Sequence, residues 1–94
     1  MMELRDTVEL MTSDDYKERF RAEYWQTYIR WRELYELLCN WDKGKLDFEP
    51  TCPRELLRKQ FLVMDSYLSR LGERASIEHI DLNQDVQRCA GKEG

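Results

Sequence analysis

The apolar positions between Tyr16 and Trp41 recur with alternating steps of four and three residues, as expected for one buried stripe of a long helix. Thr12, Ser13 and the two following aspartates supply hydroxyl caps and negative charge at its start, and Gly44 can close its end in the left-handed conformation. We therefore predict a helix from about Ser13 to Trp41. Its stripe consists of Phe20, Tyr24, Thr27, Trp31, Leu34, Leu38 and Trp41.

A second stripe with the same spacing follows after a connection of about a dozen residues. Pro53 suits the first position of a helix, where its missing amide has no intrahelical partner, and we predict this helix from Pro53 to about Glu78. Two matched stripes joined by a short connection predict an all-α fold built as an antiparallel helical hairpin. The expected core is Phe20, Tyr24, Trp31, Leu34, Leu38, Leu57, Phe61, Met64, Leu68 and Leu71.

The segments outside the two helices carry weaker patterns. Leu4, Val8 and Met11 allow a short amphipathic helix or arm that packs on the main body. In the connection, Leu46 and Phe48 alternate with charged residues, so both are expected to point inward, with Phe48 as the main anchor.

Two further expectations concern Gly72 and the residues that follow the second helix. Gly72 lies inside the helical pattern and indicates a bend or a close helix contact. Ile80 and Leu82 are expected to fold back onto the helices, and the chain is polar from Asn83 onward. We therefore expect one domain over 1–82 and a disordered tail over 83–94.

Composition narrows the class of protein. The 94 residues are 41% apolar and 36% charged, which fits one small domain. The net charge of -4 is spread through alternating signs, with no basic tract for nucleic acid. No signal peptide and no run of eighteen apolar residues is present, so we expect a cytoplasmic protein without a membrane partner.

Cysteine and histidine content gives no reason to expect a metal or other cofactor. Cys39, Cys52 and Cys89 form no C-x-x-C pair, which fits reduced thiols. Their spacing to His79 matches no zinc pattern. His79 is also the only histidine, and no nucleophile has a base at a recognisable spacing, so we do not expect an enzyme.

Some apolar residues fall outside the stripes that a single hairpin can bury. Trp25 and Ile29 form an i, i+4 pair behind the first stripe, and Leu56 and Val63 form a row on the second helix. Soluble monomers avoid a large exposed apolar patch. We therefore expect a homo-oligomer, a dimer by default, with these four residues as interface candidates.

The helices also resemble a known group of proteins. The chain resembles short phage and prophage proteins, including those of crAss-like phages. The resemblance lies in the segments Tyr16 to Tyr24 and Gln26 to Arg30, in the pair Cys52-Pro53, and in a pattern on the second helix. The similarity covers about Arg5 to Leu82. That pattern here reads Gln60, Met64, Tyr67, Leu71 and Arg74.

The hairpin is similar in architecture to the phage anti-CBASS and anti-Thoeris sponge proteins. This resemblance implies an anti-defence protein in the cytoplasm of an infected bacterium, which binds a cyclic oligonucleotide or cyclic ADP-ribose derivative between subunits without cleaving it. An alternative is a small helical module that inhibits a bacterial defence complex by protein–protein contact, with Trp25, Ile29 and exposed rings as anchors.

The residues offer the chemistry that a nucleotide needs, namely cations for phosphates and flat apolar faces for a base. Four of the seven positions in the first stripe are aromatic, which suits a pocket wall as well as plain packing. The arginines can equally pair with acidic neighbours on the surface. The candidate ligand-binding residues are Tyr28, Trp31, Tyr67, Arg70, Arg74 and Gln60.

Overall fold

The computed structural model describes residues 2–86, and every regular element in this part of the chain is helical. A short 3-10 helix, η1 (Leu4–Thr7), leads into α1 (Val8–Met11), followed by the long helices α2 (Tyr16–Asp42) and α3 (Arg54–Ile77). A further helical turn covers 83–86. The predicted all-α class is therefore confirmed. Within these residues, no helix is long and apolar enough to cross a membrane.

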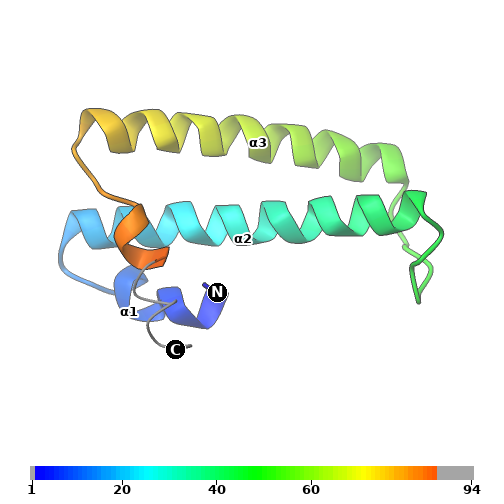
Figure 1. Ribbon diagram of the computed structural model, residues 1–94, viewed down its shortest axis with the longest axis horizontal. Helices are drawn as coiled ribbons and strands as arrows, with labels where there is room; N and C mark the ends of the chain where they lie inside the picture. The colour runs from blue at the N-terminus through cyan, green and yellow to red at the C-terminus, as the bar shows by residue number, and fades with distance from the viewer. Residues whose placement is uncertain (1, 87–94) are drawn as a thin grey trace.

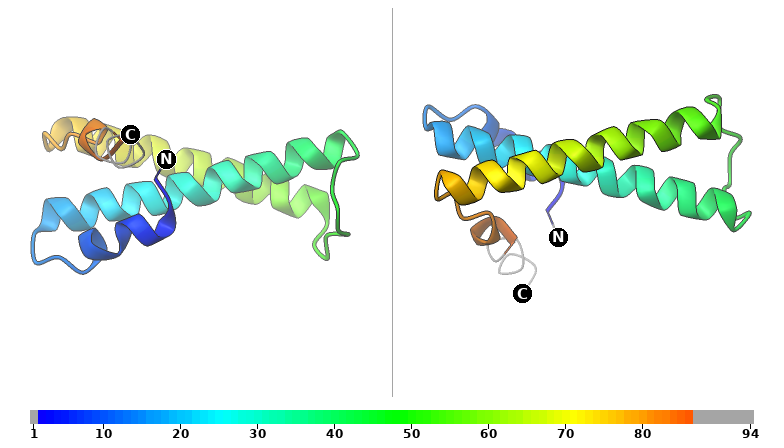
Figure 2. Two further views of the ribbon diagram at one scale, coloured as in Figure 1. Left: turned by 60° about the horizontal axis from the view of Figure 1, so that its bottom comes forward. Right: turned by 90° about the horizontal axis from the view of Figure 1, so that it is seen from above.

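The two long helices lie side by side and are joined at one end by residues 43–53 (Figure 1). The short N-terminal helices pack on the side of α2 that faces away from α3 (Figures 1 and 2). As a result α2 is covered by the N-terminal segment, by α3 and by the residues that follow α3. The far side of α3 is not covered by any other described element (Figure 2).

Both long helices begin close to the predicted residues, but α2 is capped differently. The Asp15 carboxylate accepts a hydrogen bond of 3.0 Å from the Lys17 amide, so Asp15 is the capping residue. The predicted hydroxyl caps are displaced, because the Ser13 hydroxyl accepts from the Asp15 amide instead. α2 consequently begins at Tyr16 rather than at Ser13.

Both long helices end on a residue in the left-handed conformation. Gly44 has a φ of 67°, and the Lys45 amide donates to the Asn40 carbonyl at 2.8 Å, which confirms the predicted stop. His79 takes the same role after α3 with a φ of 58°, and the Ile80 amide donates to the Ala75 carbonyl at 2.9 Å. This turn sends the chain back toward α2.

The core forms two clusters of buried residues, linked through Tyr24 and Leu82, which are partly buried and contact both. One cluster holds Phe20, Leu71, Ala75 and Ile80; the other holds Met2, Trp25 and Ile29. The predicted return of Ile80 and Leu82 onto the helices is thereby confirmed. All ten predicted core residues are buried or half-buried.

The N-terminal arm packs on α2 as predicted, but two predictions about which residues face inward are wrong. Leu4, Val8 and Met11 are exposed, whereas Met2, Thr7 and Leu10 point inward. The cause is the 3-10 turn of η1, which has about three residues per turn and shifts the register of the inward side. Phe48 is 56% exposed, while Leu46 is half-buried, so Phe48 does not anchor the connection.

Gly72 does not make the close helix contact that its position suggested. A Cβ atom built on Gly72 would meet nothing within 4 Å. Gly72 therefore marks no close helix contact, and α3 continues through it to Ile77.

Candidate functional site

The contacts divide the six candidate ligand-binding residues into two groups on different parts of the molecule. Tyr28 and Trp31 belong to an aromatic cluster where α2 meets α3. Tyr67 and Arg74 contact α2 residues toward its first turns, namely Glu23, Tyr16 and Phe20. Gln60 and Arg70 are exposed on α3. The structure therefore does not assemble the six residues into one pocket within a single chain.

The aromatic cluster is closely packed around Trp31. Its ring stacks with Phe61 at a centroid distance of 5.5 Å and with Tyr35 at 6.3 Å, and it contacts Tyr28 at 5.8 Å. The Trp31 Nε1 atom is buried and has no hydrogen-bond partner among residues 2–86. Because rings already occupy the space around Trp31, a nucleotide base could stack on it only after the cluster opens.

The second group surrounds Arg74 at the other end of the helix pair. The guanidinium carbon lies 4.9 Å from the Phe20 ring centroid, and Nη2 donates to the Tyr16 hydroxyl at 2.7 Å. The hydrogen bond to Tyr16 raises the pKa of Arg74, with Glu78 contributing further. The ring and the phenol hold the guanidinium in a fixed position on the surface.

Tyr67 and Arg70 lie on the same side of α3 as Arg74. The Tyr67 hydroxyl donates a hydrogen bond to the Glu23 carboxylate, and Arg70 pairs with Glu73 at 2.8 Å. These contacts are exposed, so they contribute little to stability and can exchange for an external anion.

Six candidates from the sequence, four for ligand and two for interface, fall on one exposed stripe of α3 that we call the outer row. Its members recur in steps of four and three, which places them on one side of a helix. The apolar members are between 42% and 77% exposed, and the polar members are exposed as well. The outer row consists of Leu56, Gln60, Val63, Tyr67, Arg70, Arg74 and Ile77.

The other two interface candidates are not on the surface. Trp25 and Ile29 are buried against Met2 and Leu82 inside the chain. Sequence reasoning placed them in an interface because the N-terminal arm and the returning segment, which cover them, have weak patterns. Trp25 and Ile29 therefore cannot serve as an exposed interface in this conformation.

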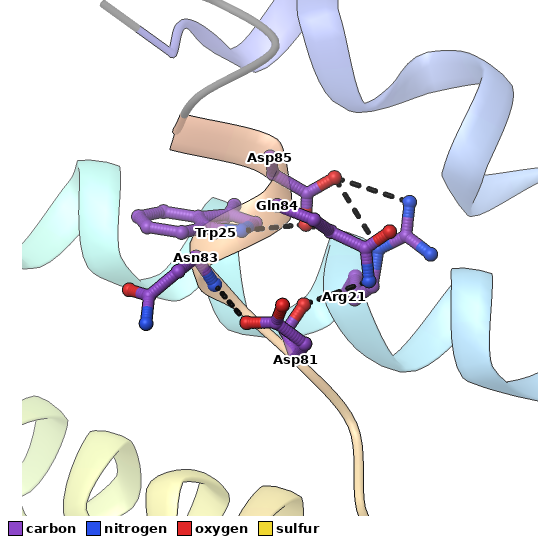
Figure 3. A network of polar contacts seen from close by, with 6 residues as sticks. All are labelled: Arg21, Trp25, Asp81, Asn83, Gln84 and Asp85. Carbon is purple, nitrogen blue, oxygen red and sulfur yellow. Dashed lines mark hydrogen bonds and ion pairs between the residues drawn. The ribbon is translucent and has the colours of Figure 1, made fainter.

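A buried carboxylate, which sequence analysis missed, covers Trp25 (Figure 3). Asp85 accepts hydrogen bonds from Arg21 Nε and Nη2 at 3.0 and 3.1 Å, and from Trp25 Nε1 at 3.0 Å. Asp85 sits in the turn that the Asp81 side chain and carbonyl stabilise by accepting from Asn83 and Gln84. Residues 83–86 thus pack on α2, contrary to the expected tail; 87–94 lie outside the described residues.

The α2 residues that contact the ligand candidates on α3 were also not predicted. Glu23, Tyr16 and Phe20 reach Tyr67 and Arg74 because α3 runs back along α2, so residues late in α3 meet residues early in α2. Which residues of α2 and α3 face each other follows from where the connection ends. In the sequence, Gly44 and Pro53 indicate where the connection begins and ends.

Two of the pockets formed by the described residues lie away from all six ligand candidates. One, of about 580 Å³, is lined by the connection, including Trp41, Phe48 and Cys52. The other, of about 300 Å³, lies between the N-terminal arm and Arg32 of α2. In the described part of the chain, no three histidine, cysteine or acidic side chains are grouped so that they could hold a metal ion.

Together, fold and surface define a small all-helical protein whose second long helix exposes a row of apolar, aromatic and guanidinium side chains. The chain belongs to the Sequestin family, because the model of that family matches residues 14–77. The match spans α2 and α3 completely and therefore includes every ligand candidate. No match to a curated protein or to a solved structure was found.

Proposed function

We propose that the protein is a phage anti-defence protein that sequesters a small nucleotide-derived immune signal without cleaving it, as a homo-oligomer in the bacterial cytoplasm. The family name denotes sequestration of a molecule. The observation that carries the proposal is the outer row of α3, where Tyr67, Arg70 and Arg74 lie exposed beside apolar side chains. A ring and two guanidinium groups on one surface match a base and its phosphates.

The guanidinium groups are suited to phosphate because each offers a planar fork of donors. Arg74 is the first choice, since the Phe20 ring and the Tyr16 hydroxyl orient it before any ligand arrives. Its ion pair with Glu78 is long, at 3.4 Å, and exposed. Replacing such a pair by a phosphate contact loses little.

The competing function, inhibition of a defence complex by protein contact, used Trp25, Ile29 and exposed rings as anchors. The side chains of Trp25 and Ile29 are buried within the chain. The burial of these two residues favours the small-molecule proposal, because the exposed surface of α3 combines the Tyr67 ring with cations.

Calorimetry against cyclic dinucleotides, cyclic trinucleotides and cyclic ADP-ribose isomers tests the proposal. We expect tight binding of at least one member, and release of the intact ligand on heating, identified by mass spectrometry. Arg74→Ala should weaken binding by about 1.5 to 3 kcal/mol, roughly ten- to a hundredfold.

Arg58→Ala is the matched control. Arg58 is also an exposed α3 arginine, paired with Glu55 at 2.7 Å, but it is not part of the outer row. Its replacement should leave the affinity unchanged. No binding to any member would overturn the proposal, and a host protein that co-purifies instead would support the protein-contact function. Recovery of a cleaved ligand would show an enzyme.

A further inference from the structure

The cavity between the N-terminal arm and α2 lies on the side of α2 that faces away from α3 (Figures 1 and 2). Its volume of about 300 Å³ is at the lower end of the range for small-molecule sites. No member of the outer row contributes to it, so it is separate from the surface proposed for sequestration. The residues that line it are Glu3, Leu4, Arg5, Ile29, Arg32 and Glu33.

The α2 side of the cavity places an apolar side chain beside two charged ones. Arg32 and Glu33 follow Ile29 by three and four positions, so both are its neighbours one turn further along the helix. Ile29 is only 2% exposed, Arg32 is half-buried and Glu33 is exposed. η1 adds the apolar side chain of Leu4 from the other side. The cavity therefore combines apolar surface with a guanidinium group and a carboxylate.

Arg32 and Glu33 both lack an ion-pair partner among residues 2–86. The guanidinium carbon of Arg32 lies 6.0 Å from the Tyr28 ring centroid, a contact that orients the group but does not neutralise it. The other two charges of the cavity pair with each other, because Arg5 contacts Glu3 at 2.8 Å. A half-buried guanidinium has lost part of its hydration, so an anion in the cavity would stabilise it. The cavity thus offers one unpaired cation and one unpaired carboxylate.

This charge pattern selects a zwitterion rather than a simple anion. Two arginines and two glutamates line the cavity, so its net charge is zero, and phosphate would meet carboxylates as well as guanidinium groups. A zwitterion instead satisfies both unpaired groups at once. Its carboxylate matches the planar fork of a guanidinium, and its ammonium group matches a carboxylate. An aliphatic α-amino acid carries both charges and an apolar side chain on one carbon atom.

We propose that the cavity between η1 and α2 binds a free aliphatic α-amino acid. The carboxylate of the ligand contacts Arg32, its ammonium group contacts Glu33, and its side chain packs on Ile29 and Leu4. All four residues belong to one chain, so the site is complete in a monomer. The inference goes beyond the proposed function, since it assigns a second ligand to a different side of α2.

Titration of the full chain with L-leucine, followed through its backbone amide signals in NMR spectra, tests the proposal. We expect saturable shifts at Leu4, Ile29 and Glu33. Isocaproic acid lacks the ammonium group and leucinamide lacks the carboxylate, so each should bind about ten- to a hundredfold more weakly than L-leucine. No saturable shift with L-leucine, or equal binding of either analogue, would overturn the proposal. Tighter binding of inorganic phosphate would show a simple anion site and would overturn it as well.

Two pairs of matched variants assign the charges. Arg32→Met and Glu33→Gln should each weaken L-leucine binding about ten- to a hundredfold. Arg30→Met and Glu36→Gln change exposed α2 residues of the same types that do not line the cavity, and both should leave the affinity unchanged. Circular dichroism should show all four variants folded. Equal affinities within either pair would contradict the assigned contacts.

The nucleotide panel separates this inference from the proposed function. Arg32→Met should bind any nucleotide ligand as tightly as the unmodified protein, because Arg32 is not in the outer row. L-leucine binding without nucleotide binding would support this site and overturn the proposed function. Nucleotide binding without L-leucine binding would do the reverse.

Discussion

Replacing Asp85 by alanine tests whether the segment after α3 is a fixed part of the fold. The substitution removes four hydrogen bonds and leaves the Arg21 guanidinium and the Trp25 indole without their shared acceptor. Breaking a buried ion pair by removing one partner typically costs about 3 to 5 kcal/mol. The Arg21 side chain is 13% exposed, so water partly replaces the lost contact. We therefore expect a loss of about 3 kcal/mol, the lower end of that range.

Thermal unfolding followed by circular dichroism at 222 nm measures this loss. For a domain of this size, each kcal/mol shifts Tm by about 4 to 8 °C, so Asp85→Ala should lower Tm by about 12 to 24 °C. Glu73→Ala is the control, because Glu73 forms an exposed pair with Arg70. Its effect should stay below about 1 kcal/mol. Equal Tm values for the two variants would refute the reasoning and show that Asp85 does not hold the segment on α2.

Four further predictions concern single side chains. His79→Gly should raise the free energy of unfolding by about 0.5 to 1 kcal/mol in urea titrations, because glycine relieves the left-handed backbone. Gly72→Ala should raise it by up to about 1 kcal/mol, since the added methyl group meets nothing; a loss would reveal a contact. Leu34→Ala should cost about 2 to 5 kcal/mol, whereas Arg32→Ala, which removes a contact with the Tyr28 ring, should cost about 0.5 to 1. Burial, followed by the charge of Tyr28, raises the pKa of Tyr24 above 10.0, so the unfolded chain ionises first and stability falls as pH rises above 10.0. Tyr24→Phe should flatten that dependence in alkaline urea titrations.

The long helices could be predicted because their signals are local and repeated. The stripe that holds Phe20, Leu34 and Leu38 recurs over about six helical turns, so errors at single positions do not change the assignment. Gly44 gave a correct stop, since its left-handed backbone follows from the residue type alone. The end of α3 lacked such a signal, because the left-handed residue there is His79, and non-glycine residues seldom take that conformation.

The tertiary contacts of short segments could not be predicted in the same way. Asp85 is a single carboxylate in a polar stretch, and only the three-dimensional approach to Arg21 and Trp25 gives it a role. The N-terminal arm packs on α2 as expected, but its inward residues were not predicted, since a single 3-10 turn changes which side faces inward. Trp25 was misassigned as a consequence, because its contacts with Met2, Leu82 and Asp85 could not be predicted even though both segments were expected to pack on the helices.

The candidate site was predicted in part. The exposed side chains on α3, including Gln60, Tyr67 and Arg74, lie on one row as their spacing indicates. Tyr28 and Trp31 were grouped with them because the sequence shows which residues share a helix side but not which side of the helix pair they reach. The contact between Trp31 and Phe61 places these rings inside the junction.

α3 packs on the rest of the protein through one side only, and this has an evolutionary consequence. Residues of the outer row contribute little to the core, which depends on α2 and on Leu71 and Ala75. Substitutions at Gln60 or Arg70 can therefore alter what the surface binds while the fold keeps its stability. Under the proposed function, single mutations in this row would change ligand preference without compensating changes elsewhere in the chain.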